Sequence, residues 1–294
     1  MKIGVVYPQT EIGTTPTEVR DYAQGVAELG YTHFLAYEHV VGGDPEQHPE
    51  LKAAPYDLDS RFQEPFVLFG YLAGIVPHMG FVTGIVILPQ RQATLVAKQA
   101  SVVDVLSDGK FRLGVGLGWN PIEYEALGQK WSNRARRFEE QIELMRELLS
   151  QKIVTFDGKY HKVTAAGLNP LPVQRPLPIW IGAAAEPAIR RAARIADGFF
   201  PLRKPEGSTW ADEIEKLHGY LEEYGRDPRQ FGIEVTLRTG NGSPEDWCKE
   251  MEEWKRLGAS HLCIHTMGCG LSGVDAHLQR LKQVAETFGL QSTN

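Results

Sequence analysis

The pattern of apolar and polar positions between residues 82 and 120 predicts a buried strand, a helix and a second strand. Val82–Leu88 is a nearly continuous apolar run, and Thr94–Leu106 carries apolar residues at helical spacing. Phe111–Gly118 alternates and then ends in glycines. A strand that is apolar on both faces belongs in a sheet covered on both sides, usually a parallel sheet with helical crossovers. This segment therefore indicates an α/β fold.

The same alternation of strand and helix continues along the chain. The expected strands are Ile3–Tyr7, Thr32–Ala36, Phe81–Leu88, Phe111–Gly118, Pro178–Gly182, Gly198–Leu202, Gly232–Leu237 and His261–Thr266. The expected helices are Pro16–Leu29, Glu64–Val76, 92–106, Asn133–Ser150, Glu186–Ile195, Ser208–Tyr224, Ser243–Leu257 and Val274–Phe288. This many strand–helix units favour closure into a (β/α)8 TIM barrel, forming one domain of residues 1–294. The alternative is an open, doubly wound sheet.

Three stretches fall outside this repeat. The pattern of residues 153–163 predicts an inserted hairpin that turns at Asp157 and Gly158. Val40–Gln63 is rich in proline, glycine and acidic residues and predicts a long loop, which inside a compact domain is usually functional or mobile. No regular structure is expected between Trp119 and Ser132.

Composition narrows the classes of function. The formal net charge is -6 and no block of Lys or Arg stands out, so neither nucleic acid nor an anionic membrane is an expected partner. Three cysteines fit no zinc or disulfide pattern, and the first residues carry no signal-peptide pattern, so a cytoplasmic location is expected. Pro77 and His78 interrupt the most apolar region, Pro65–Leu88, which predicts a buried helix and strand rather than a membrane span.

Barrels of this kind carry their active sites at the C-terminal ends of the strands. His39 directly follows the second expected strand and precedes the long loop, so it is a candidate general acid or base, with a structural histidine as the alternative. Gly114, Gly116 and Gly118 do not form a dinucleotide fingerprint, because Trp119 stands where the third glycine is needed. A tight turn, or room for a planar ligand, is expected there instead.

Other strand ends offer weaker signals. Gly182–Ala185 leads into a helix whose N-terminus is suited to phosphate, and Arg203 would add a cation. Gly84 weakens a buried strand unless a bulge or a ligand needs the space. No metal site is expected, because none of five histidines pairs with carboxylates at metal-ligand spacing: His48, His78, His161, His218 and His277. The strand ends offer no convincing lysine, which argues against an aldolase.

Three motifs together resemble one family, the luciferase-like, flavin- or deazaflavin-dependent oxidoreductases. They are LPQRQATLVAKQASVVDVLSDGKFRLGVGLGWNPIEYEALG, PLPIWIGAAAEPAIRRAARIADGFFP and HFLAYEHV. The matching blocks are spread over most of the chain, and the nearest branch is the one described as probable coenzyme F420-dependent oxidoreductase.

The resemblance implies an eight-stranded barrel with an insertion, usually a homodimer, and a flavin-type ring at the C-terminal mouth. It places the family's strand-three bulge, often a non-proline cis peptide behind the ring, on Thr83, Gly84 and Ile85. The catalytic pair after the second strand falls on Glu38 and His39. The remaining implied contacts are Gly182, Ala183, Ala184, Leu202 and Arg203 for the cofactor phosphate, and Trp119 and Asn120 for the substrate pocket.

Two positions depart from the family pattern. Trp119 stands where the sugar-phosphate dehydrogenase branch has a glutamate, so a sugar phosphate is not the expected substrate. Ala183–Ala185 lacks the second glycine and the serine that are common in the fifth-strand loop, so backbone groups must hold the phosphate.

The resulting hypothesis is an oxidoreductase that transfers a hydride between coenzyme F420 and a small organic substrate. His39 would handle a proton, and the loop Val40–Gln63 would act as a lid that excludes water. The alternatives are an FMN-dependent, luciferase-like monooxygenase and a non-catalytic flavin-binding protein on the same barrel.

Overall fold

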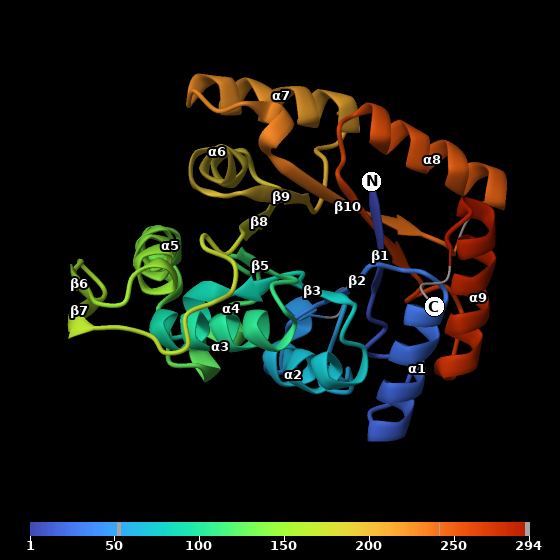
Figure 1. Ribbon diagram of the computed structural model, residues 1–294, viewed down its shortest axis with the longest axis horizontal. Helices are drawn as coiled ribbons and strands as arrows, with labels where there is room; N and C mark the ends of the chain where they lie inside the picture. Colours follow the sequence, from blue (N-terminus) through green and yellow to red (C-terminus); the bar gives the residue numbers. More distant parts are fainter. Residues whose placement is uncertain (52–53, 241, 292–294) are drawn as a thin grey trace.

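The protein is a closed barrel of parallel strands surrounded by helices, as the computed structural model in Figure 1 shows. The structure describes residues 1–51, 54–240 and 242–291. The strands of the barrel are β1 (Lys2–Val6), β2 (His33–Ala36), β3 (Gly80–Thr83), β4 (Val86–Ile87), β5 (Phe111–Gly116), β8 (Ile179–Ala183), β9 (Gly198–Pro201), β10 (Gly232–Arg238) and β11 (His261–His265). β3 and β4 are two pieces of the third barrel strand, and both pair with β5. The β3–β5 pairing closes the ring, so the barrel prediction is confirmed and the open-sheet alternative is wrong.

The helices cover the outside of the barrel (Figure 1). They are α1 (Pro16–Glu28), α2 (Pro65–Ile75), α3 (Ala93–Leu106), α4 (Pro121–Ala126), α5 (Arg134–Ser150), α6 (Glu186–Ile195), α7 (Trp210–Glu223), α8 (Pro244–Arg256) and α9 (Gly273–Phe288). Local sequence explains several of the starts. At α1, for example, Thr15 accepts from the Glu18 N–H and the Glu18 carboxylate accepts from the Thr15 N–H, with Pro16 in the first turn.

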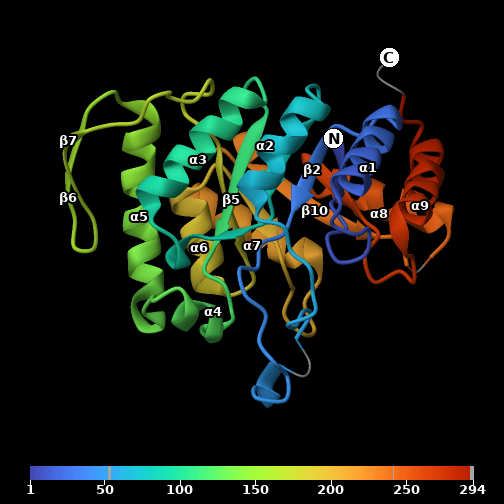
Figure 2. The same cartoon turned by 90° about the horizontal axis from the view of Figure 1, so that it is seen from below.

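The hairpin prediction is confirmed, with β6 (Val154–Asp157) paired to β7 (Lys162–Ala166). Figure 1 shows this hairpin projecting beside α5, away from the barrel. The long loop after β2 contains a short 3-10 helix, Pro49–Leu51, and part of its predicted span, residues 52–53, lies outside the described residues. Figure 2 shows the loop extending beyond the barrel on the side where α4 lies. The described part of the chain holds no helix with both the length and the apolar content that a bilayer crossing needs.

The expected third strand, Phe81–Leu88, is interrupted. β3 ends at Thr83, the Gly84–Ile85 peptide bond is cis, and β4 resumes for two residues before a 3-10 helix, Leu88–Gln90. The bulge that the family resemblance placed on Thr83–Ile85 is therefore confirmed. Thr83 anchors it from behind: its hydroxyl donates to the Gly114 carbonyl at 2.7 Å and accepts from the Gly114 N–H at 2.8 Å.

The glycines of the neighbouring strands make room for this bulge. A Cβ atom on Gly114 would lie 1.9 Å from the Thr83 carbonyl oxygen, and one on Gly116 would lie 2.8 Å from the Ile85 Cδ1. A Cβ atom on Gly182 would lie 2.9 Å from the Ile85 Cγ2. The tight-turn interpretation thus applies to Gly118, whose φ is +67°, whereas Gly114 and Gly116 are needed for close approach.

The close approach predicts a large difference between two glycine substitutions. Gly114→Ala should lower the free energy of unfolding by about 1–3 kcal/mol or more, because a backbone carbonyl occupies the space that the new methyl group needs. Gly70→Ala, in α2, meets no neighbouring atom within 4 Å and should raise it by about 0.5–1 kcal/mol. Urea unfolding of both variants measures this, and equal stability of the two would contradict the packing argument.

Candidate active site

A cavity of about 440 Å³ opens at the C-terminal end of the barrel, and we call it the C-terminal cavity. Most of the side chains that the sequence singled out line it, although they come from five different strand ends. These are Glu38, His39, Gly84, Ile85, Trp119, Gly182, Ala183, Ala184 and Leu202. The cis peptide forms part of its wall, and Ile85 lies between Gly116 and Gly182.

His39 is held by aromatic rings from the long loop. Its ring stacks on Tyr56 with the centroids 3.5 Å apart, and the edge of Phe62 packs against it at 4.9 Å. The His39 Nδ1 lies 3.3 Å from the Glu123 Oε1. Because a carboxylate can only accept, this contact places a proton on Nδ1 and leaves Nε2 for other partners.

Glu123 comes from α4, a helix that the sequence pattern did not predict. Its side chain is fully buried, and its Oε1 also accepts from the Val40 N–H at 3.0 Å. Burial on its own would raise the pKa of Glu123, but the hydrogen bond and the charge of His39 outweigh it and lower the pKa below its usual value. The sequence signal that could have predicted α4 is its start: Asn120 caps the helix, and Pro121 occupies its first position.

Glu38 is buried at the wall of the C-terminal cavity. Its Oε2 accepts from the Ile87 N–H at 2.5 Å, and its Oε1 forms an ion pair with Arg91, which also contacts Glu64 at 2.8 Å. Burial raises the pKa of Glu38 to about 7, although Arg91 opposes the shift. The Glu38 side chain therefore holds in place the backbone that follows the bulge.

Three residues that the sequence placed at the site do not line the C-terminal cavity. Thr83 lies behind the bulge. Asn120 is buried and donates to the Tyr56 hydroxyl at 2.8 Å, so it fixes the ring on which His39 stacks. Arg203 is exposed and lies outside the cavity wall, which leaves its contact with a phosphate a prediction.

The N-terminus of α6 faces the C-terminal cavity through Ala184, Ala185 and Ala188. Ala185 is the N-cap residue and provides no side-chain hydrogen bond to the first turn. Pro187 has no N–H, and the Ala188 N–H donates to the Ala185 carbonyl at 2.9 Å. The N–H groups left for an anion are therefore those of Ala185 and Glu186, as the sequence suggested for the fifth-strand loop.

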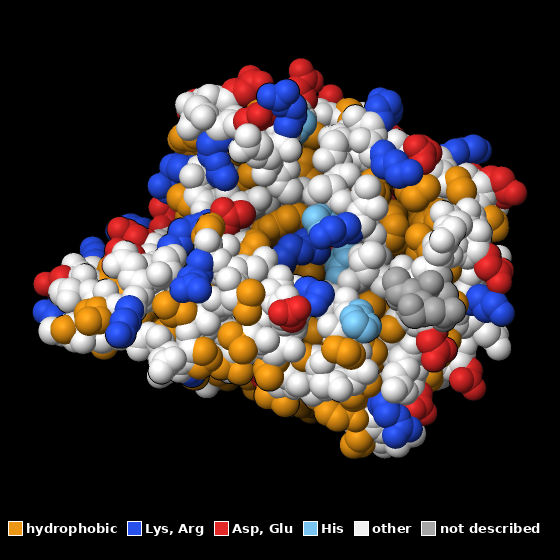
Figure 3. All heavy atoms as spheres, viewed as in Figure 1, with side chains coloured by type: hydrophobic (Ala, Val, Ile, Leu, Met, Phe, Trp, Pro, Cys, Tyr) orange, Lys and Arg blue, Asp and Glu red, His pale blue; other side chains and the backbone are white. Residues whose placement is uncertain are grey.

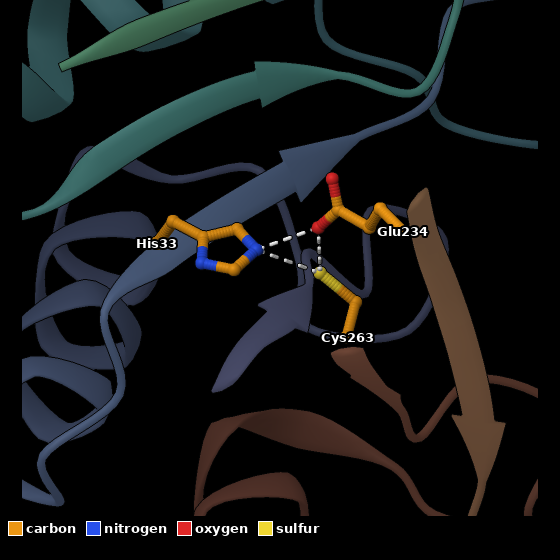
Figure 4. A group of neighbouring side chains, drawn as sticks. All are labelled: His33, Glu234 and Cys263. Carbon is orange, nitrogen blue, oxygen red and sulfur yellow. Dashed lines mark hydrogen bonds and ion pairs between the residues drawn. The ribbon is translucent and has the colours of Figure 1, made fainter. Parts of the chain in front are cut away.

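Histidines meet carboxylates elsewhere in ways that sequence spacing did not reveal. His161 contacts Glu140 at 2.8 Å, and His277 contacts Glu11 at 3.2 Å. Figure 4 shows a third group inside the barrel, in which His33 of β2, Glu234 of β10 and Cys263 of β11 point toward one another. Their possible ligand atoms lie within 4.8 Å of one another. The expectation of no metal site, based on spacing along the chain, did not consider this group.

The environment of Glu38 predicts a pH dependence of stability. The folded protein holds the Glu38 proton more tightly than the unfolded chain, so this stabilisation is present at low pH and is lost as the pH rises through about 7. Between pH 4.5 and pH 8 the free energy of unfolding of the wild type should fall by about 1–3 kcal/mol more than that of Glu38→Gln, which has no carboxyl proton to lose at this position. The control is Glu252→Gln, which removes a carboxylate that is 63% exposed on α8 and should keep the wild-type slope. Parallel profiles for wild type and Glu38→Gln, measured by urea unfolding, would contradict the assignment.

Sequence comparisons are consistent with this geometry. The chain matches the family described as luciferase-like monooxygenase over residues 1–261. The uncharacterized protein Rv0940c of Mycobacterium tuberculosis is 28% identical over 288 residues, which cover 90% of this chain and 96% of that protein. An F420-dependent glucose-6-phosphate dehydrogenase of Nakamurella multipartita is 28% identical over 221 residues, which cover 72% of this chain and 60% of that protein.

Solved structures support the same fold. Monooxygenase RslO1 from Streptomyces bottropensis superimposes with a TM-score of 0.78 at 17% identity, over 98% of both chains. An F420-dependent secondary alcohol dehydrogenase, in complex with an F420-acetone adduct, superimposes with a TM-score of 0.75 at 16% identity, over 96% of this chain and 98% of that one. At these identities the two structures bear on the fold alone. The family match covers most of the chain, and the protein therefore belongs to the luciferase-like monooxygenase family.

Proposed function

We propose that the protein is an oxidoreductase that transfers a hydride between coenzyme F420 and a small organic substrate. The proposal rests on one observation: the Gly84–Ile85 bulge and His39 line the same C-terminal cavity. The buried carboxylate of Glu123 sets the tautomer of this histidine. Two of the similar proteins described above are named as F420-dependent, one by sequence and one by structure. When bound, the deazaflavin supplies the hydride donor or acceptor.

The residues present fit such a cofactor. Gly116 and Gly182 cannot carry a Cβ without meeting Ile85, so the wall beside the bulge is backbone and Ile85 side chain, which suits a flat ring. The uncapped N-terminus of α6 would hold a phosphate with Ala185 and Glu186 N–H groups, replacing the serine hydroxyl that the family pattern usually provides. Leu202 would pack beside it.

His39 holds or delivers the proton that accompanies hydride transfer. Its Nδ1–H donates to Glu123, so its Nε2 is the atom available to a substrate hydroxyl or carbonyl. Reduction of a carbonyl adds a hydride to carbon and a proton to oxygen, and oxidation of the alcohol removes the same two. In this proposal Glu123 is the positioning residue, and Glu38 supports the bulge through Ile87.

The long loop supplies the cover of the site. Tyr56 and Phe62 come from this loop and enclose the His39 ring, and Tyr56 also packs against Trp119 with the centroids 5.5 Å apart. These aromatic contacts shield most of the imidazole from water, and Trp119 gives the C-terminal cavity an apolar side. The substrate we propose is therefore a neutral, largely apolar alcohol or carbonyl compound rather than a sugar phosphate.

A second copy of the chain is the protein partner that we propose. Large apolar side chains are exposed on α2 and α3, including Val67 at 71%, Leu106 at 53% and Leu95 at 52%. Burial of such side chains in a homodimer would remove them from water. Light scattering should give twice the chain mass of 32.8 kDa, and the mass of a single chain would contradict the homodimer.

The cofactor choice can be tested by titration of the purified protein with coenzyme F420 and, separately, with FMN. We expect cofactor fluorescence to show saturable binding of F420 at lower concentrations than FMN. Ala184→Asp places a carboxylate at the start of α6 and should weaken binding of either cofactor at least tenfold, because like charges would meet at the phosphate. Tight binding of FMN alone would favour the monooxygenase alternative, for which RslO1 is a structural precedent, and overturn the choice of F420.

The role of His39 can be tested with a double-mutant cycle. Hydride transfer with a panel of alcohols and ketones should fall by about 10²–10⁴-fold in His39→Ala, while F420 affinity stays within about threefold. Glu123→Gln should show a smaller loss, and the double variant should be no slower than His39→Ala, because Glu123 acts through His39. His218→Ala, on the outer helix α7, is the control. Unchanged turnover in His39→Ala would refute its role, and F420 binding without turnover in the wild type would favour the non-catalytic alternative.

A further inference from the structure

A second, larger cavity lies at the opposite, N-terminal end of the barrel. Its volume is about 720 Å³, and its walls are the first residues of the strands, including Lys2, His33, Arg112, Trp180 and His261. We call it the N-terminal cavity. In barrels of this type the N-terminal face usually serves stability, so a hollow of this size is not accounted for by hydride transfer at the other end.

The N-terminal cavity is lined by positive charge. Four of its residues are cations, Lys2, Lys110, Arg112 and Arg229. Arg229 pairs with Asp227 at 2.9 Å, and Lys110 lies 3.6 Å from the exposed Asp108. The carboxylate among its described lining residues, Asp197, accepts from Arg146 at 3.0 Å and from the Ile179 N–H at 2.8 Å. Figure 3 looks onto this face and shows Lys, Arg and His side chains gathered in and around the central hollow. Such a concentration of like charge in a recess attracts anions.

Two contacts hold the Arg112 side chain in place in the N-terminal cavity. Its Nη1 donates to the Glu234 Oε2 at 2.7 Å, and its guanidinium lies over Trp180 at 4.5 Å from a ring centroid. The side chain is 14% exposed. Among the described residues no other acceptor binds this guanidinium, so most of its N–H groups remain available to a ligand in the cavity.

The group in Figure 4 contacts Arg112 through Glu234. His33 Nε2 lies 2.6 Å from the Glu234 Oε1, and the Cys263 thiol donates to the same oxygen at 3.1 Å. Burial would raise the pKa of Glu234, but Arg112 and His33 outweigh it and hold the pKa well below its usual value. This carboxylate is thus ionised and fully hydrogen-bonded. The positive charge of Arg112 beside it disfavours a divalent cation, so we do not assign a metal to His33, Glu234 and Cys263.

His261 also lines the N-terminal cavity. Burial, and then the charge of Arg112, lower its pKa to about 3, so the ring is neutral at physiological pH. Its ring packs edge-on against Trp180 at 5.3 Å. The groups that face it are therefore cations and aromatic rings, with Glu234 as the one buried counter-charge.

We propose that the N-terminal cavity binds a small organic anion. A carboxylate or phosphate group would pair with Arg112 and Lys110, and an apolar or aromatic body would lie against Trp180 and Phe231, which line the same cavity. Arginine suits both oxyanions because its planar N–H groups match two oxygens at once. The site is separate from the C-terminal cavity, and it does not depend on the proposed redox reaction.

Calorimetric titration with phenyl phosphate, benzoate and inorganic phosphate tests the proposal. We expect saturable binding of phenyl phosphate or benzoate, and the stronger of the two identifies the preferred oxyanion. Inorganic phosphate should bind at least tenfold more weakly than phenyl phosphate, because it lacks the apolar body. Equal affinity for inorganic and phenyl phosphate, or no binding of any probe at millimolar concentration, would overturn the proposal.

Variants locate the binding site. Lys2→Gln combined with Lys110→Gln removes two exposed cations and should weaken the preferred anion at least tenfold. The matched control is Lys249→Gln, a cation that is 78% exposed on α8 and should change the affinity less than twofold. Ala184→Asp, in the C-terminal cavity, should also leave the affinity unchanged. If Ala184→Asp lost anion binding while the double lysine variant kept it, the anion would bind in the C-terminal cavity, and the proposed site would be refuted.

Arg112 needs a paired change, because its loss alone would leave the buried Glu234 without its cation. Arg112→Met combined with Glu234→Gln removes both charges together. This variant should abolish binding of the preferred anion and retain a cooperative thermal transition. A folded variant that binds the anion with wild-type affinity would refute the role of Arg112.

Discussion

The contact between the interrupted third strand and the glycines beside it is the constraint on which the C-terminal end of the barrel depends. Ile85 reaches the positions that side chains on Gly116 and Gly182 would occupy, and Thr83 is bonded to both backbone groups of Gly114. The glycines therefore belong to the same feature as the cis peptide, although they lie on different strands. Glu38 completes this arrangement by binding Ile87 and Arg91 beyond the bulge.

The chemistry we propose relies on a second layer of contacts. His39 is fixed on one side by Glu123 and on the other by Tyr56, which Asn120 holds in turn. These contacts join the end of β2, the long loop and α4 into one unit. A buried carboxylate that sets the tautomer of a histidine is a common way to prepare that histidine for proton transfer. The N-terminal cavity, in contrast, uses a buried carboxylate to fix an arginine.

Much of the fold could be predicted from the sequence, because the alternation of apolar strands and amphipathic helices reports the barrel directly. The family resemblance located the bulge at Thr83–Ile85, which periodicity alone read as a continuous strand. Glu123 was missed because α4 spans only six residues and has no amphipathic pattern to recognise. Asn120 was expected to face the substrate, but its side chain turns inward to Tyr56. The group of His33, Glu234 and Cys263 could not be found by spacing, since closure of the barrel brings distant strands together.

The central claim is that a flat cofactor lies against the Gly84–Ile85 bulge with its phosphate at the start of α6. Hydrogen exchange of the whole chain, measured with and without a saturating amount of coenzyme F420, tests this most directly. Slower exchange is predicted for the amides of Ile85, Ala185 and Glu186, with the N-terminal cavity around Arg112 unchanged. Protection confined to the N-terminal end of the barrel, or absent from both the bulge and the α6 N-terminus, would contradict the account.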